Sequence, residues 1–467
     1  MLDLDADITG LRGADYNPRK ISEADLASLA RSIETLGLVK PLIVRGDLLV
    51  AGHQRTRALR SLGVTRAAVY RLDSATTVYD EVRFNQLHNG TGLDAGDEAA
   101  RIDGGFPALG WHVIDPSRVR ANFRGKLAGV RDEIAVLINR YGPWGGVVAT
   151  RQGEVIHAAQ YALSAFLTHS PLTVHVLDDD KIPYARAALG VDYGVFDYSG
   201  IERHTYIQTL AQMTRLRESS TLDKKSRLYD GFVIPAAEAS PTTRFLDFGS
   251  GHADYAKAMR RRGFHFDDVE LFRRIAGANA IDSRSVHAMI DKLCASLAVG
   301  PYDAVVCDAV LNSVDSAQAE GAVMTTLNAL TKLGGRIFIS GRPRERLVDN
   351  TRETKRNPQH HRRLVEFVDQ DGFTALFRAG HWFFQRYHGK AEVQPLCERF
   401  GFRVDVHKHG NGAWQAVATK VRQLPADEVR AALRFEFNQP LGDGVSLGRA
   451  EDVIRAVELH PSRRPAA

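Results

Sequence analysis

One short segment limits the fold of this chain more than any other. Residues 244–254 read Arg-Phe-Leu-Asp-Phe-Gly-Ser-Gly-His-Ala-Asp, an apolar run that ends in Gly-x-Gly, and the residues after them are typical of a helix. A glycine turn between a buried strand and a helix lets a ligand approach the backbone at the carboxyl end of a parallel strand, where open α/β sheets bind their ligands. The segment therefore predicts a parallel α/β sheet with a ligand-binding edge.

The spacing to a later acid indicates the class of ligand. Glu270 follows Gly251 by 19 residues (270 − 251), the distance at which an acid at the end of the second strand can accept both ribose hydroxyls. Strands and helices then continue to alternate, and the pattern closes with a strand pair. We expect a helix at 323–333 and strands at 302–308, 334–340, 402–407 and 413–419.

This order resembles the class I methyltransferases. Asp247-x-Gly249-x-Gly251 is similar to their first motif, with Ala253 in place of the usual third glycine. The resemblance implies S-adenosylmethionine as the cofactor, with the first-motif residues on its methionine side and Glu270 at its ribose. Dinucleotide binding is the alternative for such a turn, but the terminal strand pair and the Lys332-Leu-Gly-Gly-Arg336 entry into the fifth strand favour the methyltransferase.

Two further acids belong to the same predicted edge. By the same resemblance Asp282 contacts the adenine amine, although an ordinary helix N-cap before 286–293 explains it equally well. Asp308, which ends the fourth strand, is a candidate both for cofactor binding and for catalysis.

Residues 17–71 form the clearest local pattern in the chain. Ser22 begins a short amphipathic helix that Gly37 ends, strands follow at 41–44 and 48–51, and a second helix then opens. A helix N-terminus presents free N–H groups to anions, and guanidinium groups are suited to phosphate. The segment therefore predicts a phosphate cradle, unless its arginines are simply solvated, made by Gly52, His53, Gln54, Arg55 and Arg57.

This pattern resembles the N-terminal domain of the ParB/sulfiredoxin superfamily, through Asn17-Pro-Arg19, Lys40-Pro-Leu-Ile-Val44 and Gly52-His-Gln-Arg-Thr-Arg-Ala58. The resemblance implies that the Gly-x-x-Arg-x-x-Ala box binds a nucleoside triphosphate, which is CTP in the partition proteins of that family. His53 stands where partition proteins commonly have an acid, and no helix-turn-helix region is recognisable downstream. We therefore do not expect a role in chromosome partition.

Part of this module recurs further along the chain. Identical residues lie 105 positions apart, namely Asn17 and Asn122, Arg19 and Arg124, Ile33 and Ile138, and Gly37 and Gly142. The recurrence predicts a duplicated domain, with a chance match as the alternative. The second copy has lost the glycine and both guanidinium groups of the box, so we expect it to be structural, as a dimerisation or docking surface. Its replacements are Ala158, Tyr161 and Leu163.

These patterns predict an α/β multidomain chain. An α+β ParB-like module, duplicated with a degenerate second copy, precedes a Rossmann-like class I methyltransferase sheet that has a terminal antiparallel strand. The expected parts are a ParB-like module at 1–80, its degenerate repeat at 105–180, a helical linker at 181–225, the methyltransferase at 226–420 and a small helical extension at 421–467.

The composition is that of a folded globular protein. Hydrophobic residues make up 44% and charged residues 25% of the 467 positions. The three cysteines have no metal-ligand spacing, so we expect no metal site and read them as reduced core residues of a cytoplasmic protein. We expect no signal peptide or membrane segment. The net charge of +5 permits a polyanionic partner without requiring one.

The sequence also bears on the methyl acceptor. Residues 308–313 lack the Asp/Asn-Pro-Pro-aromatic motif of amino-directed DNA methyltransferases, and the Pro-Cys nucleophile of cytosine-C5 enzymes is absent. Val310-Leu-Asn312 and residues 335–340 and 382–387 are nevertheless similar to methyltransferases that accompany DNA-modification systems. We therefore expect an unusual or modified base as the acceptor.

Two stretches could contact a nucleic acid. The basic run at 342–363 could neutralise phosphates, unless it is a solvated loop, and we assign that role to Arg342, Arg356, Arg362 and Arg363. The aromatic run at 382–387 could stack an unpaired base or belong to the core. His381 and His388 are candidate bases.

The leading interpretation is a methyltransferase that acts on nucleic acid, DNA rather than RNA, and forms a homodimer through its N-terminal half. One alternative is a small-molecule methyltransferase with a structural N-terminal half. Another is a DNA-associated nucleotide switch whose methyltransferase fold is inactive.

Overall fold

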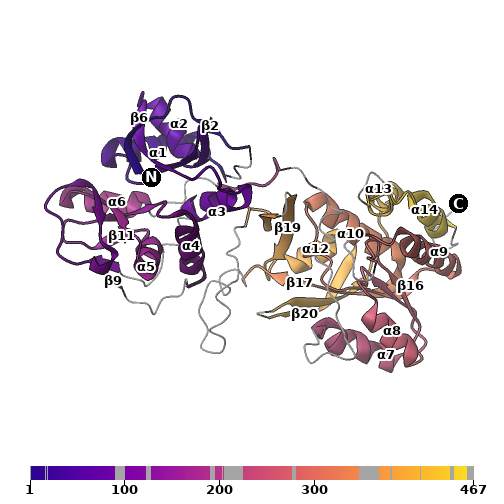
Figure 1. Ribbon diagram of the computed structural model, residues 1–467. Coiled ribbons are helices and arrows are strands. Elements are labelled where there is room, and N and C mark those ends of the chain that lie inside the picture. The colour runs from indigo at the N-terminus through magenta and orange to yellow at the C-terminus, as the bar shows by residue number, and fades with distance from the viewer. Residues whose placement is uncertain are drawn as a thin grey trace. The chain divides into compact units, whose positions relative to one another are not determined.

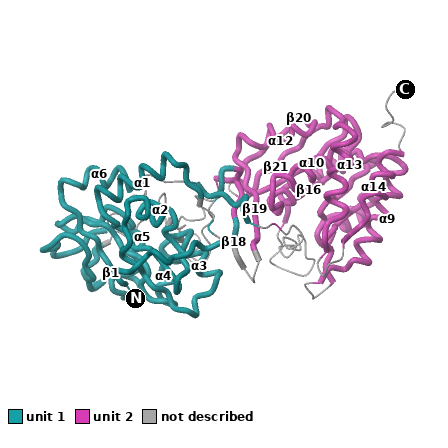
Figure 2. Tube along the Cα trace, turned by 90° about the horizontal axis from the view of Figure 1, so that it is seen from above, with its two compact units in different colours: residues 1–201, 347–370, 375–380 teal, residues 202–346, 371–374, 381–467 magenta. Residues whose placement is uncertain are grey.

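The structure is a computed structural model of the whole chain. It describes residues 2–15, 17, 19–89, 100–121, 128–189, 195–201, 203, 225–275, 280–345, 368–378, 381–410, 412–441 and 446–459. The chain divides into two compact units, shown in Figure 2. The first comprises residues 1–201, 347–370 and 375–380, and the second comprises residues 202–346, 371–374 and 381–467.

The first module of the first unit is a five-stranded sheet with two helices (Figure 1). Its strand order is β1-β6-β4-β5-β2, with β4 parallel to β6 and antiparallel to β5. The elements are β1 (Leu2–Asp7), β2 (Arg12–Gly13), β3 (Arg19–Lys20), α1 (Glu23–Leu36), β4 (Leu42–Arg45), β5 (Leu48–Ala51), α2 (His53–Ser61) and β6 (Arg66–Arg71).

Local chemistry explains why α1 has these ends. The Ser22 hydroxyl accepts the Asp25 N–H, which satisfies one of the free donors of the first turn. Gly37 ends the helix at φ 77°, a conformation that costs glycine least, and its N–H donates to the Ile33 carbonyl. Both predicted ends of this helix are confirmed.

The second module follows the same order of elements. Its four-stranded sheet runs β11-β10-β12-β8, with β10 parallel to β12 and antiparallel to β11. Its outer strand β8 is antiparallel to β12, as β1 is to β6 in the first module. The elements are β8 (Gly110–Ile114), α4 (Ala128–Tyr141), β10 (Gly146–Ala149), β11 (Val155–His157), α5 (Ala159–Leu167) and β12 (Leu172–Val176). The shared pairing supports a duplication, which remains our proposal.

Helix α3 (Val78–Asn89) joins the two modules through buried polar side chains. Asn85 donates to the Val50 carbonyl of the first module at 2.9 Å, and Arg83 pairs with Glu133 on α4 of the second. Asp80 accepts from Arg140 of α4 at 2.7 Å. The remaining elements of this unit are β7 (Ala100–Ile102), β9 (Val119–Ala121), α6 (Ile182–Leu189), β13 (Val195–Phe196) and the short 3-10 helices at Pro116–Arg118 and Asp179–Lys181.

The second unit is built on a mixed sheet that begins β15-β14-β16-β17. These four strands are parallel, and β21 then adds antiparallel to β17, with β20 antiparallel to β21. The expected terminal antiparallel strand is therefore present. The strands of this unit are β14 (Phe245–Phe248), β15 (Phe266–Val269), β16 (Tyr302–Cys307), β17 (Thr331–Pro343), β19 (His381–His388), β20 (Phe402–His409) and β21 (Trp414–Lys420). Strand β18 (Phe373–Arg378) begins in this unit, and its residues from 375 onward belong to the first unit.

Strand β19 was missed by the sequence analysis, which treated 382–387 only as an aromatic run. It pairs in parallel with the last residues of β17, through Arg342 with Tyr387 and Pro343 with His388. Because parallel strands place their carboxyl ends at one edge, the end of β19 lies at the same edge as the ends of β16 and β17.

Helices cover both faces of this sheet. Figure 1 shows α7 and α8 on one side and α9, α13 and α14 on the other, and each set packs on its own apolar core. The helices are α7 (Ile234–Ala239), which follows a short π-helix at Tyr229–Val233, α8 (Asp254–Arg261), α9 (Ser283–Val299), α10 (Ala317–Leu330), α12 (Val393–Arg399), α13 (Ala426–Phe437) and α14 (Ala450–Glu458).

The residues predicted as a small helical C-terminal extension include two helices, α13 and α14, that pack on the core of the sheet. Leu433 and Phe437 of α13 and Val453 of α14 are buried in the same apolar cluster as Val305 and Ile337 of the central strands. An apolar helix face has to be covered, and here the sheet and its helices cover it. Residues 421–459 are thus part of the methyltransferase unit where the structure describes them.

Three smaller expectations concern cysteines, metals and membranes. All three cysteines are free, with Cys307 and Cys397 buried and Cys294 half-buried. Among the described residues, no group of His, Cys, Asp and Glu side chains could hold a metal ion. No described helix combines the length and the apolar composition that a membrane span requires.

Candidate functional sites

The turn after β14 has the geometry that a ligand-binding turn requires. Gly249 adopts φ 75°, and a Cβ there would lie 2.4 Å from Cγ2 of Val310, so a side chain cannot be accommodated. Ala253, which replaces the third glycine, adopts φ 58° directly before α8. A left-handed alanine costs about 1 kcal/mol or more, a strain that is often kept at functional sites. The turn therefore keeps its close backbone approach despite the alanine.

Acidic side chains gather beside this turn. Asp247 at the end of β14 is buried, and its pKa is raised to about 7, chiefly by burial and further by the charges of Asp308, Asp268 and Glu270. The neighbouring phenol of Tyr229 opposes the rise. A buried group of like charges is costly unless an opposite charge joins it. The edge of this sheet therefore favours a cation.

Glu270 and Asp282 lie on the loop that follows β15. Glu270 is buried, and its carboxylate accepts the N–H of Gly251 at 2.7 Å and the N–H of Phe272 at 3.0 Å. It is therefore fixed directly against the predicted cofactor turn. Asp282 caps α9 and accepts both the N–H and the hydroxyl of Ser285. This is the ordinary capping role, and the adenine contact of Asp282 remains a prediction.

Hydrogen bonds hold the loop after β16 both near its start and further along. Ser340 of β17 donates to Asp308 and accepts the N–H of Ala309, which is held at φ 63°. Further along, the carbonyl of Asn312 accepts the N–H of Arg386 at 3.3 Å. Strain at Ala309, beside the acid that ends the fourth strand, marks this loop as a functional segment.

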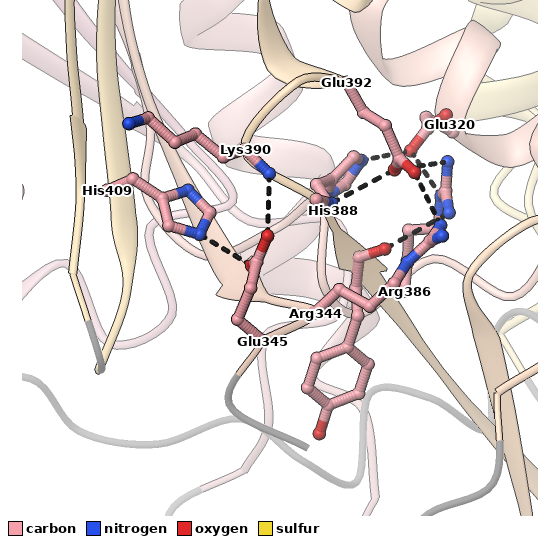
Figure 3. Close-up of polar contacts among 10 residues, drawn as sticks. Glu320, Arg344, Glu345, Arg386, His388, Lys390, Glu392 and His409 are labelled. Atoms are coloured by element: carbon pink, nitrogen blue, oxygen red, sulfur yellow. Dashed lines mark hydrogen bonds and ion pairs between the residues drawn. The ribbon is translucent and has the colours of Figure 1, made fainter. Parts of the chain in front are cut away.

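The buried carboxylate of Glu320 on α10 joins this loop to β19 (Figure 3). It accepts from Nε of Arg386 at 3.1 Å and lies 2.6 Å from Nε2 of His388. The side chain of His388 is buried, with the ring edge-on to Trp414. A general base must reach the acceptor, so these contacts favour a structural role for His388 over the catalytic role we expected.

Arg342 is also engaged within its own unit. It is half-buried, and Nη1 donates to the side chains of Gln385 and Tyr387. The two residues that follow β17 form the outer part of the network in Figure 3. Arg344 pairs with Glu392 at 2.8 Å, and Glu345 accepts from His409 at 2.7 Å. These contacts brace the edge and leave Arg342 a weaker candidate for phosphate contact.

Several predicted contacts fall outside the described residues. Arg356, Arg362 and Arg363 lie in 346–367, and the side chain of His381 is likewise not described. In the aromatic run, Phe384 and Tyr387 are buried, and the guanidinium group of Arg203 lies 4.0 Å from the ring centroid of Phe384. These two aromatics belong to the core, which leaves Trp382 and Phe383 as the half-buried members of the run.

In the first unit, the predicted cradle has the expected backbone. Gly52 adopts φ 98° before α2, and a Cβ there would lie 2.7 Å from Cδ2 of Leu42. His53 accepts the N–H of Ala14 through Nε2 at 3.1 Å. Burial, with the nearby charge of Arg55, lowers the pKa of His53 to about 4. The imidazole is therefore neutral at physiological pH.

The two arginines of the box differ from each other. Arg55 is half-buried, and Nη1 donates to the carbonyls of Lys40 and Pro41 at 2.7 and 3.3 Å. Arg57 is exposed and donates to Gln54 and Glu23, each at 3.1 Å. Arg55 thus supports the backbone next to the cradle, while Arg57 and Gln54 lie on its outer side.

In the second module a different side chain holds the corresponding loop. Ala158 takes the left-handed position of Gly52 at φ 62°, and Tyr161 takes the place of Arg55. The Tyr161 hydroxyl accepts the N–H groups of Trp144 and Gly145 at 2.8 and 2.9 Å, in the loop before β10. In the first module Arg55 holds the loop before β4 through its N–H donors. In the second module Tyr161 holds the loop before β10 through its hydroxyl, which acts as an acceptor.

Comparison with known proteins agrees with this division. The family profile described as ParB N-terminal domain matches residues 4–82, and the profile described as methyltransferase domain matches residues 206–405. Two probable chromosome-partitioning proteins ParB, from two strains of Xylella fastidiosa, are each 42% identical over 78 and 79 residues. The match covers 15% of this chain and 25% and 26% of these relatives, so the chain spans about a quarter of their length.

Solved structures of methyltransferases show weaker similarity. The magnesium protoporphyrin IX methyltransferase of Synechocystis, with bound S-adenosylmethionine, is 14% identical, with 41% of this chain and 77% of that chain covered and a TM-score of 0.24. The 1,6-didemethyltoxoflavin-N1-methyltransferase of Burkholderia thailandensis is 13% identical, with 42% and 79% covered and a TM-score of 0.27. Values of this size do not by themselves establish a common fold, so the assignment rests on the family profiles.

The family profiles, the fold of the second unit and the geometry of its glycine turn agree with one another. The chain therefore joins a region that matches the ParB N-terminal domain, at residues 4–82, to a region that matches a methyltransferase domain, at residues 206–405.

Proposed function

We propose that the chain transfers a methyl group from S-adenosylmethionine to a nucleic acid, with DNA favoured over RNA and an unusual or modified base as the acceptor. The observation that carries this proposal is the presence of a ParB N-terminal domain on the same chain as the methyltransferase domain. The relatives of that domain are described as probable chromosome-partitioning proteins, and a chromosome consists of DNA.

The residues of the second unit fit this cofactor. The turn at Gly249 has the left-handed backbone that such a turn requires, and Glu270 lies against the same turn at Gly251. S-adenosylmethionine carries a sulfonium and an ammonium group, and when bound it supplies an electrophilic methyl group. The acidic surroundings of Asp247 match these positive charges. Glu270 would hold the ribose, as the spacing predicts.

The acceptor then belongs beside the loop after β16. A nitrogen or oxygen acceptor that gains a methyl group has to lose a proton, so it needs a hydrogen-bond acceptor nearby. We assign this role to Asp308, which Ser340 orients. Asn312 is the second polar residue of the loop, and Arg386 fixes its carbonyl.

Transfer of labelled methyl groups tests the proposal. Single-stranded DNA, double-stranded DNA, RNA, genomic DNA that contains modified bases and a metabolite extract would be offered in parallel. We expect label in DNA, most of all in the modified sample, and none with the Glu270→Ala variant. DNA binding should fall steeply as salt rises, since phosphate contacts release counterions. Label that appears in the metabolite extract alone would favour the small-molecule alternative.

We further propose that the Gly52 loop binds a nucleoside triphosphate. The left-handed Gly52 and the start of α2 support this role. The test is calorimetry with a panel of nucleoside triphosphates against the wild type and Gly52→Val. Cytoplasmic location and dimerisation through the first unit also remain proposals, which cell fractionation and light scattering would test.

A further inference from the structure

The tip of the β20–β21 hairpin meets the segment before the π-helix at one edge of the methyltransferase sheet. Strand β21 is antiparallel to β17, and its first residue, Trp414, pairs with Gly341 near the carboxyl end of β17. The hairpin tip therefore lies at the carboxyl edge, where open α/β sheets bind their ligands. There Gly412 lies against the guanidinium group of Arg227, since a Cβ on Gly412 would be 3.4 Å from Nη1.

The backbone beside Arg227 is anchored to the helix that follows the glycine turn. The N–H of Ser226 donates to the hydroxyl of Tyr255 in α8 at 2.8 Å. The ring of Tyr229 stacks on the ring of Tyr255, with 4.2 Å between the centroids. Because Tyr255 follows Gly251 of the turn by only four residues (255 − 251), the backbone of Arg227 is held close to the predicted cofactor site.

Two cations at this edge have no acidic partner. Arg227 and Lys408 are exposed, and neither side chain forms a hydrogen bond or an ion pair within the described ranges of the chain. Lys408 lies over the ring of Phe232, with Nζ 4.7 Å from the ring centroid. Asp230, three positions after Arg227, accepts the hydroxyl of Tyr255 at 3.3 Å and pairs with neither cation. Both positive charges are therefore available to a ligand.

The glycines of the hairpin tip leave the guanidinium group of Arg227 uncovered. A Cβ on Gly412 would lie 3.4 to 3.7 Å from three atoms of this group, and a Cβ on Gly410 would lie 4.0 Å from Nη1. Gly410 does not have a left-handed φ, so its backbone conformation does not require glycine. A larger side chain at either position would cover part of the guanidinium group, whereas glycine leaves room for a ligand.

Charges of opposite sign occupy different parts of this edge. Asp247 and Asp308 lie at the ends of β14 and β16 beside the glycine turn, where we expect the cationic cofactor. Arg227 and Lys408 lie instead with the β20–β21 hairpin. Guanidinium and ammonium groups bind phosphate. A second ligand at this edge therefore meets cations, which favours an acceptor that carries phosphate groups.

We propose that Arg227 and Lys408 form a phosphate-binding site for the nucleic acid that accepts the methyl group. This inference rests on the proposed function and adds to it a contact surface within the described residues. Two separate segments of the chain supply the two cations, so a ligand with phosphates in series can contact both. The two side chains bind the acceptor and take no part in the transfer of the methyl group.

Binding of labelled single-stranded and double-stranded DNA across a salt series tests this proposal. For Arg227→Ala and for Lys408→Ala we expect affinity at low salt to fall by about threefold to tenfold, because each variant loses a phosphate contact. The slope of log affinity against log salt should decrease by about one for each variant. Arg227→Lys keeps the charge and should keep the slope. In methyl transfer to genomic DNA, KM should rise while kcat stays unchanged.

Arg403→Ala is the matched control. Arg403 is an exposed arginine on the same strand as Lys408, but it lies near the start of β20, away from the hairpin tip, and pairs with Asp405 at 3.3 Å. We expect this variant to bind DNA as the wild type does. All of these variants should bind S-adenosylmethionine with unchanged affinity in calorimetry, because the proposed contacts are made to the acceptor alone.

The outcomes separate the phosphate site from the proposed function. Weaker DNA binding by Arg227→Ala and Lys408→Ala, but not by Arg403→Ala, supports the phosphate site. If the wild type binds and methylates DNA and the first two variants do so equally well, the phosphate site is overturned and the proposed function stands. An equal loss in all three variants reflects total charge and overturns the site as well. If the wild type neither binds nor methylates DNA, the proposed function fails, and the phosphate site fails with it.

Discussion

In the first unit, basic side chains lie close to the glycine turn at Gly52. In the second unit, buried acidic side chains lie close to the glycine turn at Gly249. In the first unit burial, together with the charges of Lys40 and Arg55, lowers the pKa of His88 and of His157 well below the ordinary value. In the second, Asp308, Asp268 and Glu270 help burial to raise the pKa of Asp247 to about 7. Both turns place a left-handed glycine between a strand and a helix. The same backbone conformation thus lies among side chains of opposite charge, which favours ligands of opposite charge at the two sites that we propose.

The largest expected effect comes from the two glycines. Gly52→Val and Gly249→Val each place a β-branched side chain at positive φ, with a Cβ at 2.7 Å from Leu42 and 2.4 Å from Val310. The backbone strain costs about 1–3 kcal/mol, and the steric overlap costs about as much again. We expect each variant to lose more than about a hundredfold in affinity for its own ligand. Calorimetry with triphosphate and with S-adenosylmethionine would measure both.

The control for this experiment is the corresponding turn of the second module. Ala158→Gly removes a side chain from φ 62° and should leave both affinities unchanged. If Gly52→Val weakened both ligands equally, the effect would be general unfolding, and the comparison of the two turns would lose its support.

The next effect concerns the acid of the second turn. Glu270→Ala removes a buried carboxylate that accepts the Gly251 N–H and is expected to hold the ribose. We expect S-adenosylmethionine binding to weaken by about 1–3 kcal/mol, as for a hydrogen bond to a charged group. Triphosphate binding should stay unchanged in the same calorimetric series. An unchanged affinity for S-adenosylmethionine would remove Glu270 from the cofactor site.

The next prediction compares the two modules by the free energy of unfolding and by triphosphate binding. Arg55→Ala and Tyr161→Phe each remove the brace of the loop before the first central strand. Each leaves buried backbone groups without a partner, which costs about 1–3 kcal/mol. Denaturant unfolding should show a comparable loss for both. Only Arg55→Ala should also weaken triphosphate binding, and a matching loss in Tyr161→Phe would mean that the two positions do not differ in function.

The smallest effect is the pH dependence of S-adenosylmethionine binding at the second site. With a pKa of about 7, Asp247 is partly protonated near neutrality, and a cationic ligand requires it ionised. Binding of S-adenosylmethionine should therefore release a proton below pH 7 and weaken by about tenfold per pH unit there. Asp247→Asn should flatten this dependence, and a dependence that survives this change would have another source.

The sequence by itself determined the local elements and their order. Ser22 and Gly37 set the ends of α1 through bonds to residues three and four positions away, and the glycines of both turns were recognisable because only their neighbours in sequence decide their conformation. The spacing from Gly251 to Glu270 identified an acid that the structure places against the turn. Both domains followed from such local patterns.

Only the tertiary structure decided which distant side chains meet. His157 joins Lys40 because β11 packs on Val39, and His388 became a core residue because β19 adds to the end of β17 and meets Glu320. Residues 421–459 joined the methyltransferase core because their apolar helix faces needed cover. Such contacts depend on packing between segments far apart in the chain, which local composition and spacing do not encode.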